Sequence, residues 1–488
     1  MSKLLQNKDT IRHNKRSRAA GSKRLALISL GCAKNLVDSE IMLAKLALAG
    51  YELVVDEAEA ETIIVNTCGF IAEAKQESLD TIHEVSKLKY SGKLQKLVVT
   101  GCLSQRYQHD LREQLPEVDL FTGTNDYARI VEMLQDGATA GNIPGTHFTP
   151  TLMDYRGDLP RLQVTPFYTA YLKVAEGCSK TCTFCVIPRI RGGFRSRLLE
   201  DVVREAEGLA ANGVVELNLI AQEITSYGKD LGGEIDLPRL LRELHAIEEL
   251  RWIRVLYNYP TELSEAILAT YAELPKVCPY IDLPLQHIND RILRLMKRGT
   301  RRQSTLALLE RIRAFLPQAA LRSSFIAGFP GETEAEFDEL LSFVRGGGFH
   351  RLAIFRYSPE EGSAAAELPG ALPGQVVEER LRLLCEARDA AARLWNEQLL
   401  GSVQQVLVEG PPAADREGLL VARLATQAPE IDGVVYLRCN GVTLPEAGSF
   451  VGAALVEADT VDFIAEPARR RTDASAAAAG PRLRVLPA

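Results

Sequence analysis

Residues 176–185 read EGCSKTCTFC and place three cysteines, Cys178, Cys182 and Cys185, in one short segment. Soft thiolate ligands at this spacing are typical of an iron–sulfur cluster. A four-iron cluster normally takes four cysteines, so three would leave one iron open to a ligand from outside the protein. The alternative is a zinc knuckle or incidental cysteines, but no fourth Cys or His follows at the spacing of a zinc site.

A repeating pattern surrounds this segment over residues 167–400. Apolar runs each lead into a loop, with helical segments between them: TAYLKVAEGC, VVELNLIAQE, WIRVLYNYP, YIDLPLQHI, LRSSFIAGFPGE and RLAIFRYSPEEG. Strands that alternate with helices indicate a parallel sheet with right-handed crossovers. The pattern therefore predicts an α/β domain, a partial (β/α)6 barrel whose site lies at the carboxyl ends of the strands.

The three-cysteine segment resembles that of the radical S-adenosylmethionine (SAM) superfamily, and Phe184 matches the aromatic residue that precedes the last cysteine there. The resemblance implies that the open iron binds SAM and that reductive cleavage of SAM yields a radical. FIAGFPGE (325–332) and LNLIAQE (217–223) resemble the segments that contact SAM in this superfamily. The weaker candidates for SAM contacts are Phe184, Gln222, Glu223, Ile326 and Gly328. Gln222 and Glu223 fit a helix cap or a loop contact equally well.

Three more cysteines, Cys32, Cys68 and Cys102, each end an apolar run in the region 25–140. Alternating strands and helices again predict a parallel sheet, whose strand ends share one edge. Three thiols at that edge would form a soft-metal site that is one ligand short of four. Packing of cysteine as a small apolar residue explains any one of them, but it explains three equivalent strand ends poorly.

GCAKNLVDSE (31–40), NTCGFIAEAKQES (66–78) and GCLSQRY (101–107) resemble the N-terminal domain of the methylthiotransferases. This family belongs to the radical SAM enzymes and carries a C-terminal TRAM β-barrel. The resemblance implies two [4Fe-4S] clusters and two SAM molecules, with Cys32, Cys68 and Cys102 holding an auxiliary cluster that carries the transferred sulfur. It also implies an electron donor of the flavodoxin or ferredoxin type.

Local sequence favours one branch of this family. The tRNA-modifying branch shows Gln-Met-Asn after the first cysteine and Ser after the second, whereas this chain has Ala33-Lys34-Asn35 and Gly69. The chain resembles the branch that adds a methylthio group to the β-carbon of an aspartate in a small-subunit ribosomal protein. The alternatives are an enzyme that acts on a tRNA adenosine and a non-catalytic iron–sulfur or zinc protein.

Composition and charge describe the rest of the 488 residues. Apolar residues make up 46% and charged residues 25%, which excludes global disorder. No signal peptide or membrane-spanning run is found, so we expect a cytoplasmic protein without membrane contact. The expected segments are a flexible basic arm at 1–24, a methylthiotransferase α/β domain at 25–140, a linker at 141–166, the barrel at 167–400, a TRAM-like β-barrel at 401–466 and a disordered tail at 467–488.

Charge is distributed unevenly between the two ends. Residues 1–24 have a net charge of +7, which suits contact with ribosomal RNA, although such arms are common. Residues 402–466 have a net charge of −7, which would repel RNA and attract a basic ribosomal protein, or simply form a solvated acidic surface. Four arginines follow the cysteine segment and fit either carboxylate binding or solvated loop charges: Arg189, Arg191, Arg195 and Arg197.

Overall fold

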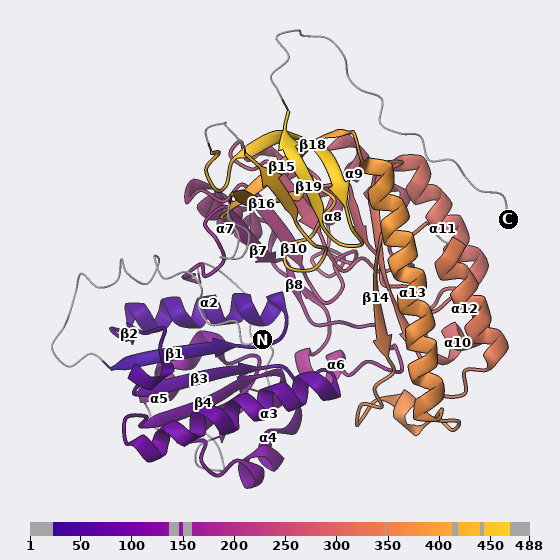
Figure 1. Cartoon of the computed structure of the whole chain (residues 1–488). Helices are drawn as coiled ribbons and strands as arrows, with labels where there is room; N and C mark the ends of the chain where they lie inside the picture. Colours follow the sequence, from indigo (N-terminus) through magenta and orange to yellow (C-terminus); the bar gives the residue numbers. More distant parts are fainter. Residues whose placement is uncertain are drawn as a thin grey trace.

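The computed structural model describes residues 23–135, 146–149, 159–346, 348–411, 418–439 and 444–468. They form a parallel α/β unit, a second α/β unit whose two sheets contain six parallel strands, and a closed β-barrel (Figure 1). The expected fold class is confirmed. The expected arm at 1–24 and tail at 467–488 lie almost wholly outside the described residues.

The first unit is a six-stranded sheet in the order β2-β1-β3-β4-β5-β6, and every pair in it is parallel. Its strands are β1 (Arg24–Ser29), β2 (Glu52–Leu53), β3 (Thr62–Thr67), β4 (Lys96–Gly101), β5 (Leu120–Thr122) and β6 (Thr146–His147). Its helices are α2 (Ala33–Leu48), α3 (Ala72–Ser86), α4 (Cys102–Gln114) and α5 (Ile130–Gln135), with short 3₁₀ turns at Glu57–Glu59, Lys87–Ser91 and Tyr127–Arg129. The edge strand β6 falls in the segment expected to be a linker.

Both faces of this sheet are buried, which explains why its strands read as continuous apolar runs rather than alternating ones. Leu25 and Leu27 of β1 pack in one apolar cluster with residues of α2 and α5. Ala26 and Ile28 of the same strand pack in another cluster with residues of α3 and α4. The strand ends therefore remain the part of the sheet that can present polar or reactive groups.

The second unit contains two three-stranded parallel sheets, in the orders β11-β10-β7 and β12-β13-β14, with β11 and β12 in contact. The strands are β7 (Thr169–Lys173), β10 (Glu216–Ile220), β11 (Trp252–Val255), β12 (Tyr280–Asp282), β13 (Ala320–Ala327) and β14 (Arg351–Arg356). The helices are α7 (Leu199–Ala211), α8 (Leu237–Ala246), α9 (Glu265–Glu273), α10 (Asp290–Leu295), α11 (Arg302–Phe315), α12 (Glu334–Gly346) and α13 (Gly374–Leu399). These six strands are the six apolar runs that the sequence predicts.

Shorter elements complete the second unit near the cysteine segment. They are the β8 (Ala175–Glu176) and β9 (Arg195–Ser196) pair, α6 (Ile187–Arg191) and the 3₁₀ turn Ala364–Glu367. Side-chain caps begin several of the outer helices: Asp236 accepts from the N–H of Arg239 at α8, and Ser264 accepts from the N–H of Ile267 at α9. These caps end the loops that leave the strands.

The C-terminal unit is a closed barrel in the order β15-β16-β17-β19-β18. Its strands are β15 (Val403–Gly410), β16 (Leu419–Leu424), β17 (Val435–Arg438), β18 (Phe450–Ala458) and β19 (Phe463–Pro467). Val406, Leu437, Leu455 and Phe463 are among the buried apolar residues that fill it. A closed barrel has no free sheet edge, so this small unit completes its own hydrogen bonding.

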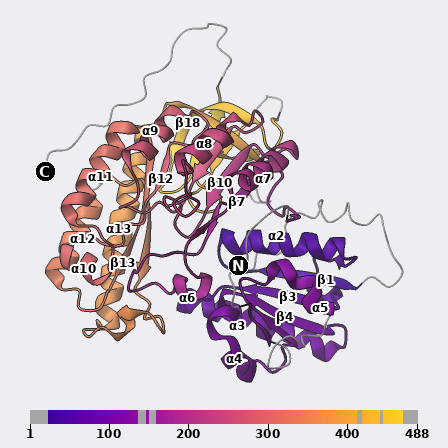
Figure 2. The same ribbon diagram turned by 180° about the vertical axis from the view of Figure 1, so that it is seen from behind.

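The first unit and the C-terminal barrel each contact the second unit directly. Helix α2 of the first unit packs against β7 of the second, and α4 packs against α6. Figures 1 and 2 show α2 on the side of the first sheet that faces the second unit, with the C-terminal barrel lying over the β7–β10 end. Within the described residues, no helix combines the length and apolar character that crossing a membrane requires.

Candidate active site

The structure places the first cysteine trio at the ends of three neighbouring parallel strands. Cys32 follows β1, Cys68 follows β3, and Cys102 begins α4 directly after β4. The approach is close: a Cβ atom at Gly31 would lie 3.0 Å from the Cys68 sulfur. Burial raises the pKa of Cys68 to about 12, and the Cys102 and Cys32 thiols contribute to that rise. The three thiols therefore share one site at one sheet edge.

Two buried asparagines fix the backbone around this trio. The Asn35 side-chain amide donates to the carbonyl oxygens of Leu30 at 3.1 Å and Thr67 at 2.9 Å, which ties the β1 turn to β3. The Asn66 amide donates to the carbonyl of Asn35 at 2.9 Å. Past the strand ends, these backbone carbonyls accept hydrogen bonds from side-chain amides. These bonds fix the positions of the turns that carry the cysteines.

The second trio lies on the loop between β8 and α6. The N–H of Cys178 donates to the carbonyl of Gly192 at 3.1 Å, and the N–H of Cys185 donates to the carbonyl of Cys182 at 3.2 Å. Burial raises the pKa of Cys185 to about 12, with further contributions from the Cys182 and Cys178 thiols. These mutual effects show that the three thiols lie close together.

Two groups from loops of the second unit reach the second trio. The Arg298 guanidinium lies 3.4 Å from the Cys182 sulfur, and the Tyr259 hydroxyl lies 3.7 Å from the same sulfur. Hydrogen bonds to ligand sulfurs are one of the ways in which a protein sets the potential of an iron–sulfur cluster. Sequence reasoning did not single out either residue, because both lie far along the chain from the cysteines.

The donor atoms fit four-iron clusters. Among the described residues, no three Cys, His, Asp or Glu side chains surround one point closely enough to hold a single metal ion. A four-iron cluster makes a different demand, because each thiolate binds its own iron. Each trio supplies three soft sulfurs and an arginine N–H aimed at one of them, which suits an anionic, thiolate-bound group.

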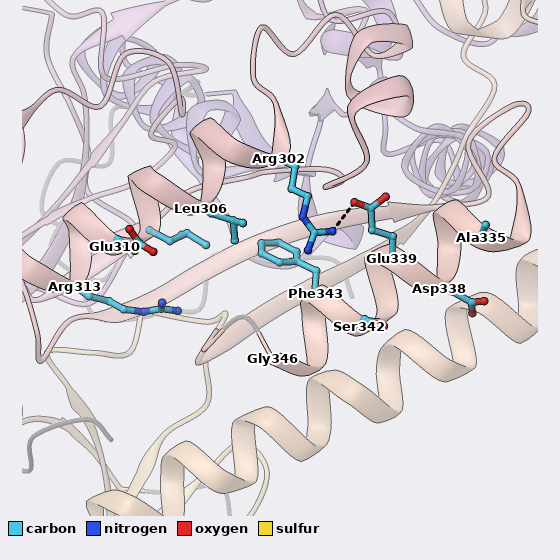
Figure 3. Close-up of a pocket in the computed structure, with 11 residues that line it drawn as sticks. Arg302, Leu306, Glu310, Arg313, Ala335, Asp338, Glu339, Ser342, Phe343 and Gly346 are labelled. Atoms are coloured by element: carbon cyan, nitrogen blue, oxygen red, sulfur yellow. Dashed lines mark hydrogen bonds and ion pairs between the residues drawn. The ribbon is translucent and has the colours of Figure 1, made fainter. Parts of the chain in front are cut away.

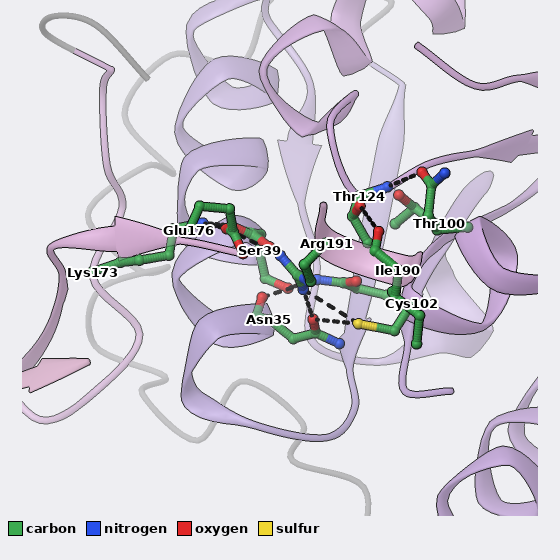
Figure 4. A network of polar contacts seen from close by, with 12 residues as sticks. Asn35, Ser39, Thr100, Cys102, Thr124, Lys173, Glu176, Ile190 and Arg191 are labelled. Atoms are coloured by element: carbon green, nitrogen blue, oxygen red, sulfur yellow. Dashed lines mark hydrogen bonds and ion pairs between the residues drawn. The ribbon is translucent and has the colours of Figure 1, made fainter. Parts of the chain in front are cut away.

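A buried polar network runs from the first cysteine site into the second unit (Figure 4). Arg191, the last residue of α6, lies 3.4 Å from the Cys102 sulfur and also donates to Asn35. Its other nitrogen donates to Asp38 at 2.8 Å. Lys173 of β7 donates to the same aspartate, so charged groups of the second unit enter the first cysteine site.

Glu176 extends this network toward the predicted SAM contacts. It accepts from Lys173 at 2.8 Å and lies directly before the cysteine segment. The Gln222 amide donates to Glu176 at 2.5 Å, while its own carbonyl oxygen is buried without a partner among the described residues. An unused buried acceptor of this kind fits the ammonium group of a SAM molecule.

Comparisons with known proteins find relatives that match most of the chain. Family models match at residues 24–123 (uncharacterized protein family UPF0004), 172–344 (radical SAM superfamily) and 400–467 (TRAM domain). The ribosomal protein uS12 methylthiotransferase RimO of Geobacter sulfurreducens is 46% identical over 451 residues, which cover 91% of this chain and 98% of that protein. The protein of the same name from Anaeromyxobacter sp. (strain K) is 46% identical and covers 90% of this chain and 92% of its own.

The chain belongs to the uS12 methylthiotransferase family. A solved structure of similar fold is the radical SAM methyltransferase TsrM from Kitasatospora setae, with a TM-score of 0.52, 17% identity, and coverage of 70% of this chain and 75% of that chain. At that identity the likeness concerns the fold alone. The predicted family, and with it the expected SAM and [4Fe-4S] cofactors, is confirmed by the close relatives and the radical SAM match.

The other SAM-contact candidates of this methylthiotransferase occupy different surroundings. Glu223 accepts from the N–H of Ser226 at 3.1 Å, as a turn cap does, and its other oxygen lies 4.0 Å from Lys180 in the cysteine segment. Phe184 and Ile326 pack in one apolar cluster, so the structure brings the two segments together. These contacts place the candidates beside the second trio without assigning them a ligand.

Gly328 has a packing reason of its own. Its φ is +79°, and a Cβ atom there would lie 2.8 Å from a methyl group of Val377 on α13. In this methylthiotransferase, therefore, helix α13 fills the space beside Gly328. The resemblance alone suggested Gly328 only as a contact for SAM.

The four arginines after the cysteine segment separate into distinct roles. Arg191 belongs to the buried network, and Arg197 pairs with Glu205 at 2.6 Å. Arg195 is half-buried and donates to the carbonyl of Gly193 at 2.9 Å, whereas Arg189 is exposed. Protein carboxylates thus bind Arg191 and Arg197, and Arg189 fits the alternative of a solvated loop charge.

A cavity of about 590 Å³ lies elsewhere, on the outer face between α11 and α12 (Figure 3). Its lining includes Leu306, Phe343 and the Arg302–Glu339 ion pair at 2.6 Å. It contains none of the six cysteines. In this methylthiotransferase the groove is therefore separate from both cysteine trios.

Proposed function

We propose that this chain is a radical SAM methylthiotransferase that transfers a methylthio group to ribosomal protein uS12, with the β-carbon of an aspartate as the acceptor. The observation that carries the proposal is the pair of cysteine trios in a chain 46% identical to a named uS12 methylthiotransferase over 91% of its length. A buried polar network runs from Cys102 to Glu176, two residues before Cys178. When bound, two [4Fe-4S] clusters and SAM would supply the radical, the methyl group and the sulfur that this reaction needs, with electrons from an external donor.

The protein's own residues prepare that chemistry. Cys178, Cys182 and Cys185 would hold the cluster that cleaves SAM, and Gln222 offers a buried acceptor nearby. A radical is needed because the target C–H bond is too weakly acidic for a side-chain base near neutral pH. The radical must be kept from water, and the contacts of α2 with β7 and of α4 with α6 bring the first two units together around this chemistry.

Cys32, Cys68 and Cys102 would hold the auxiliary cluster. Arg191 donates to the Cys102 sulfur and so orients one of its ligands. Because the trio sits where α2 and α4 meet the second unit, a sulfur held there would lie near the predicted SAM site. This arrangement supports transfer between the two sites.

Two further partners are part of the proposal. The net charge of −7 over residues 402–466 favours encounter with a basic ribosomal protein over RNA. The net charge of +7 over residues 1–24 would allow contact with ribosomal RNA. A flavodoxin or ferredoxin would deliver the electrons. The salt dependence of the rate, measured on isolated uS12 and on assembled small subunits, separates the contribution of residues 402–466 from that of residues 1–24.

The test is mass spectrometry of uS12 after incubation with the anaerobically reconstituted full-length chain, SAM and a reductant. We expect about eight irons per chain and one methylthio group on an aspartate. A variant with Cys32, Cys68 and Cys102 changed to Ala should keep about four irons and SAM cleavage but form no product. Cys385→Ala, on α13 away from both trios, is the matched control and should retain both activities. Modification of tRNA with none on uS12 would contradict the substrate assignment.

A further inference from the structure

Lys34 is a buried cation without an anionic partner. Its side chain is 6% exposed, and its ammonium nitrogen lies 3.1 Å from the centre of the Tyr257 ring. Among the described residues it makes this cation–π contact and no hydrogen bond or ion pair. The nearby cations Lys173 and Arg191, in contrast, each have carboxylate partners.

This situation is unusual for a lysine. An ammonium group has three N–H donors, and a lysine this buried is normally paired. An aromatic face attracts the charge but accepts none of those donors as a carboxylate does. Lys34 therefore holds a charge and free donors that an incoming anion could satisfy with a charge-assisted hydrogen bond.

The Lys34–Tyr257 pair lies between the two cysteine trios. Lys34 follows Cys32 by two residues in the first turn of α2. Tyr257 lies in the loop after β11, and two residues later the hydroxyl of Tyr259 lies 3.7 Å from the Cys182 sulfur. One short loop thus reaches the second trio at one point and Lys34, beside the first trio, at another.

The Tyr257 backbone is strained in the conformation that places its ring. Its φ is +68°, a left-handed conformation that a bulky residue rarely adopts and that concentrates at functional sites. Its N–H donates to Asp282 at 2.8 Å, and its carbonyl accepts from the N–H of Ile224 at 3.1 Å. These two bonds keep the ring under the ammonium group.

We propose that Lys34 binds the carboxylate of the acceptor side chain and so selects an aspartate as the substrate residue. The inference rests on the proposed function and adds the group that recognises the acceptor. Before substrate arrives, Tyr257 holds the ammonium in position. The arriving carboxylate then takes the free N–H donors, which fixes the neighbouring carbon between the two cysteine sites.

The test uses the iron-loaded full-length chain and two forms of uS12, the natural protein and a variant whose modified aspartate is changed to asparagine. Binding is measured by fluorescence anisotropy of labelled uS12 without SAM, and KM and kcat are measured with SAM. The wild-type chain should bind the aspartate form about tenfold to hundredfold more tightly than the asparagine form. Lys34→Met should remove most of that preference and raise KM, whereas Lys34→Arg should restore part of it.

Lys45→Met, on the same helix α2, is the matched control and should keep the full preference. Iron content should be unchanged in all three variants, and SAM cleavage without uS12 should be unchanged in Lys45→Met. Equal binding of both uS12 forms by the wild-type chain, or an unchanged preference in Lys34→Met, would overturn the role of Lys34. Loss of iron in both Lys34 variants would assign it a structural role and overturn it too. Failure of the wild-type chain to modify uS12 at all would instead refute the proposed function.

Discussion

Arg191 brings a positive charge from the second unit into the first cysteine site. Its side chain is 2% exposed and contacts Asp38, Glu176 and the Cys102 sulfur. Removing one member of a buried charge network leaves the others without compensation, which costs far more than loss of a surface pair. A single arginine therefore couples the stability of the unit contact to the geometry of a cysteine ligand.

We expect Arg191→Met to lower the free energy of unfolding by about 3 to 5 kcal/mol, as removal of one partner from a buried pair does. The measurement is urea-induced unfolding of the full-length chain, followed by circular dichroism. Arg382→Met removes an exposed ion pair with Glu379 on α13 and should leave the unfolding midpoint almost unchanged. A midpoint for Arg191→Met equal to that of the control would show that the network adds no stability.

At the scale of elements, the turns after the parallel strands decide where the first trio lies. Gly31, between β1 and α2, has a φ of +84°, and a Cβ atom there would lie 2.8 Å from the Cys68 Cβ. Both the conformation and the contact require glycine at this turn. The turn thus brings Cys32 and Cys68 together.

We expect Gly31→Ala to cost about 1 to 3 kcal/mol of stability and to reduce iron from about eight toward four per chain, because the added methyl group pushes against Cys68. Gly50→Ala is the matched control. Its φ is +90°, but no atom lies within 4 Å of the added carbon, so it tests backbone strain without the contact. Iron counting and the SAM cleavage rate compare the two variants. Full iron retention in Gly31→Ala would contradict the steric argument.

At the scale of the whole molecule, a buried triad attaches the C-terminal barrel to the second unit. Glu216 of β10 accepts from Arg254 of β11 at 3.1 Å and from Arg423 of β16 at 2.5 Å. Burial by itself would raise the pKa of Glu216, but the two guanidinium groups lower it to about 2. Arg254 also donates to the carbonyl of Ala425 at 2.6 Å, so both arginines link the two units.

This pKa gives a pH dependence with a definite sign. The folded value of about 2 lies below the ordinary 4.5, so the stabilisation is complete above about pH 5 and is lost as the pH falls toward 2. The contribution is on the order of 3 kcal/mol. We expect urea midpoints of the wild-type chain to fall more steeply between about pH 5 and pH 3 than those of Glu216→Gln. Equal slopes would show that Glu216 does not titrate with folding.

The fold and the cysteines could be predicted because their signals are local. An apolar run marks a strand, and a cysteine at its end inherits the position of that strand at the edge of a parallel sheet. Gly328 was found by motif, but its packing against Val377 could not be, since α13 lies almost 50 residues further along the chain. Tyr259 and Arg298 were missed because no motif or spacing near either residue indicates a contact with Cys182.

The amino-acid sequence by itself determined the three units, the two cysteine trios and the family. The reason is that strand periodicity and ligand spacing are local patterns, which can be recognised within a few residues. Only the tertiary structure decided which charges meet at the contacts between units. Arg423 and Glu216 are 207 residues apart, and Lys34 meets Tyr257 across two units. The physical reason is that such contacts depend on how the finished units pack, and no local pattern of residues encodes that placement.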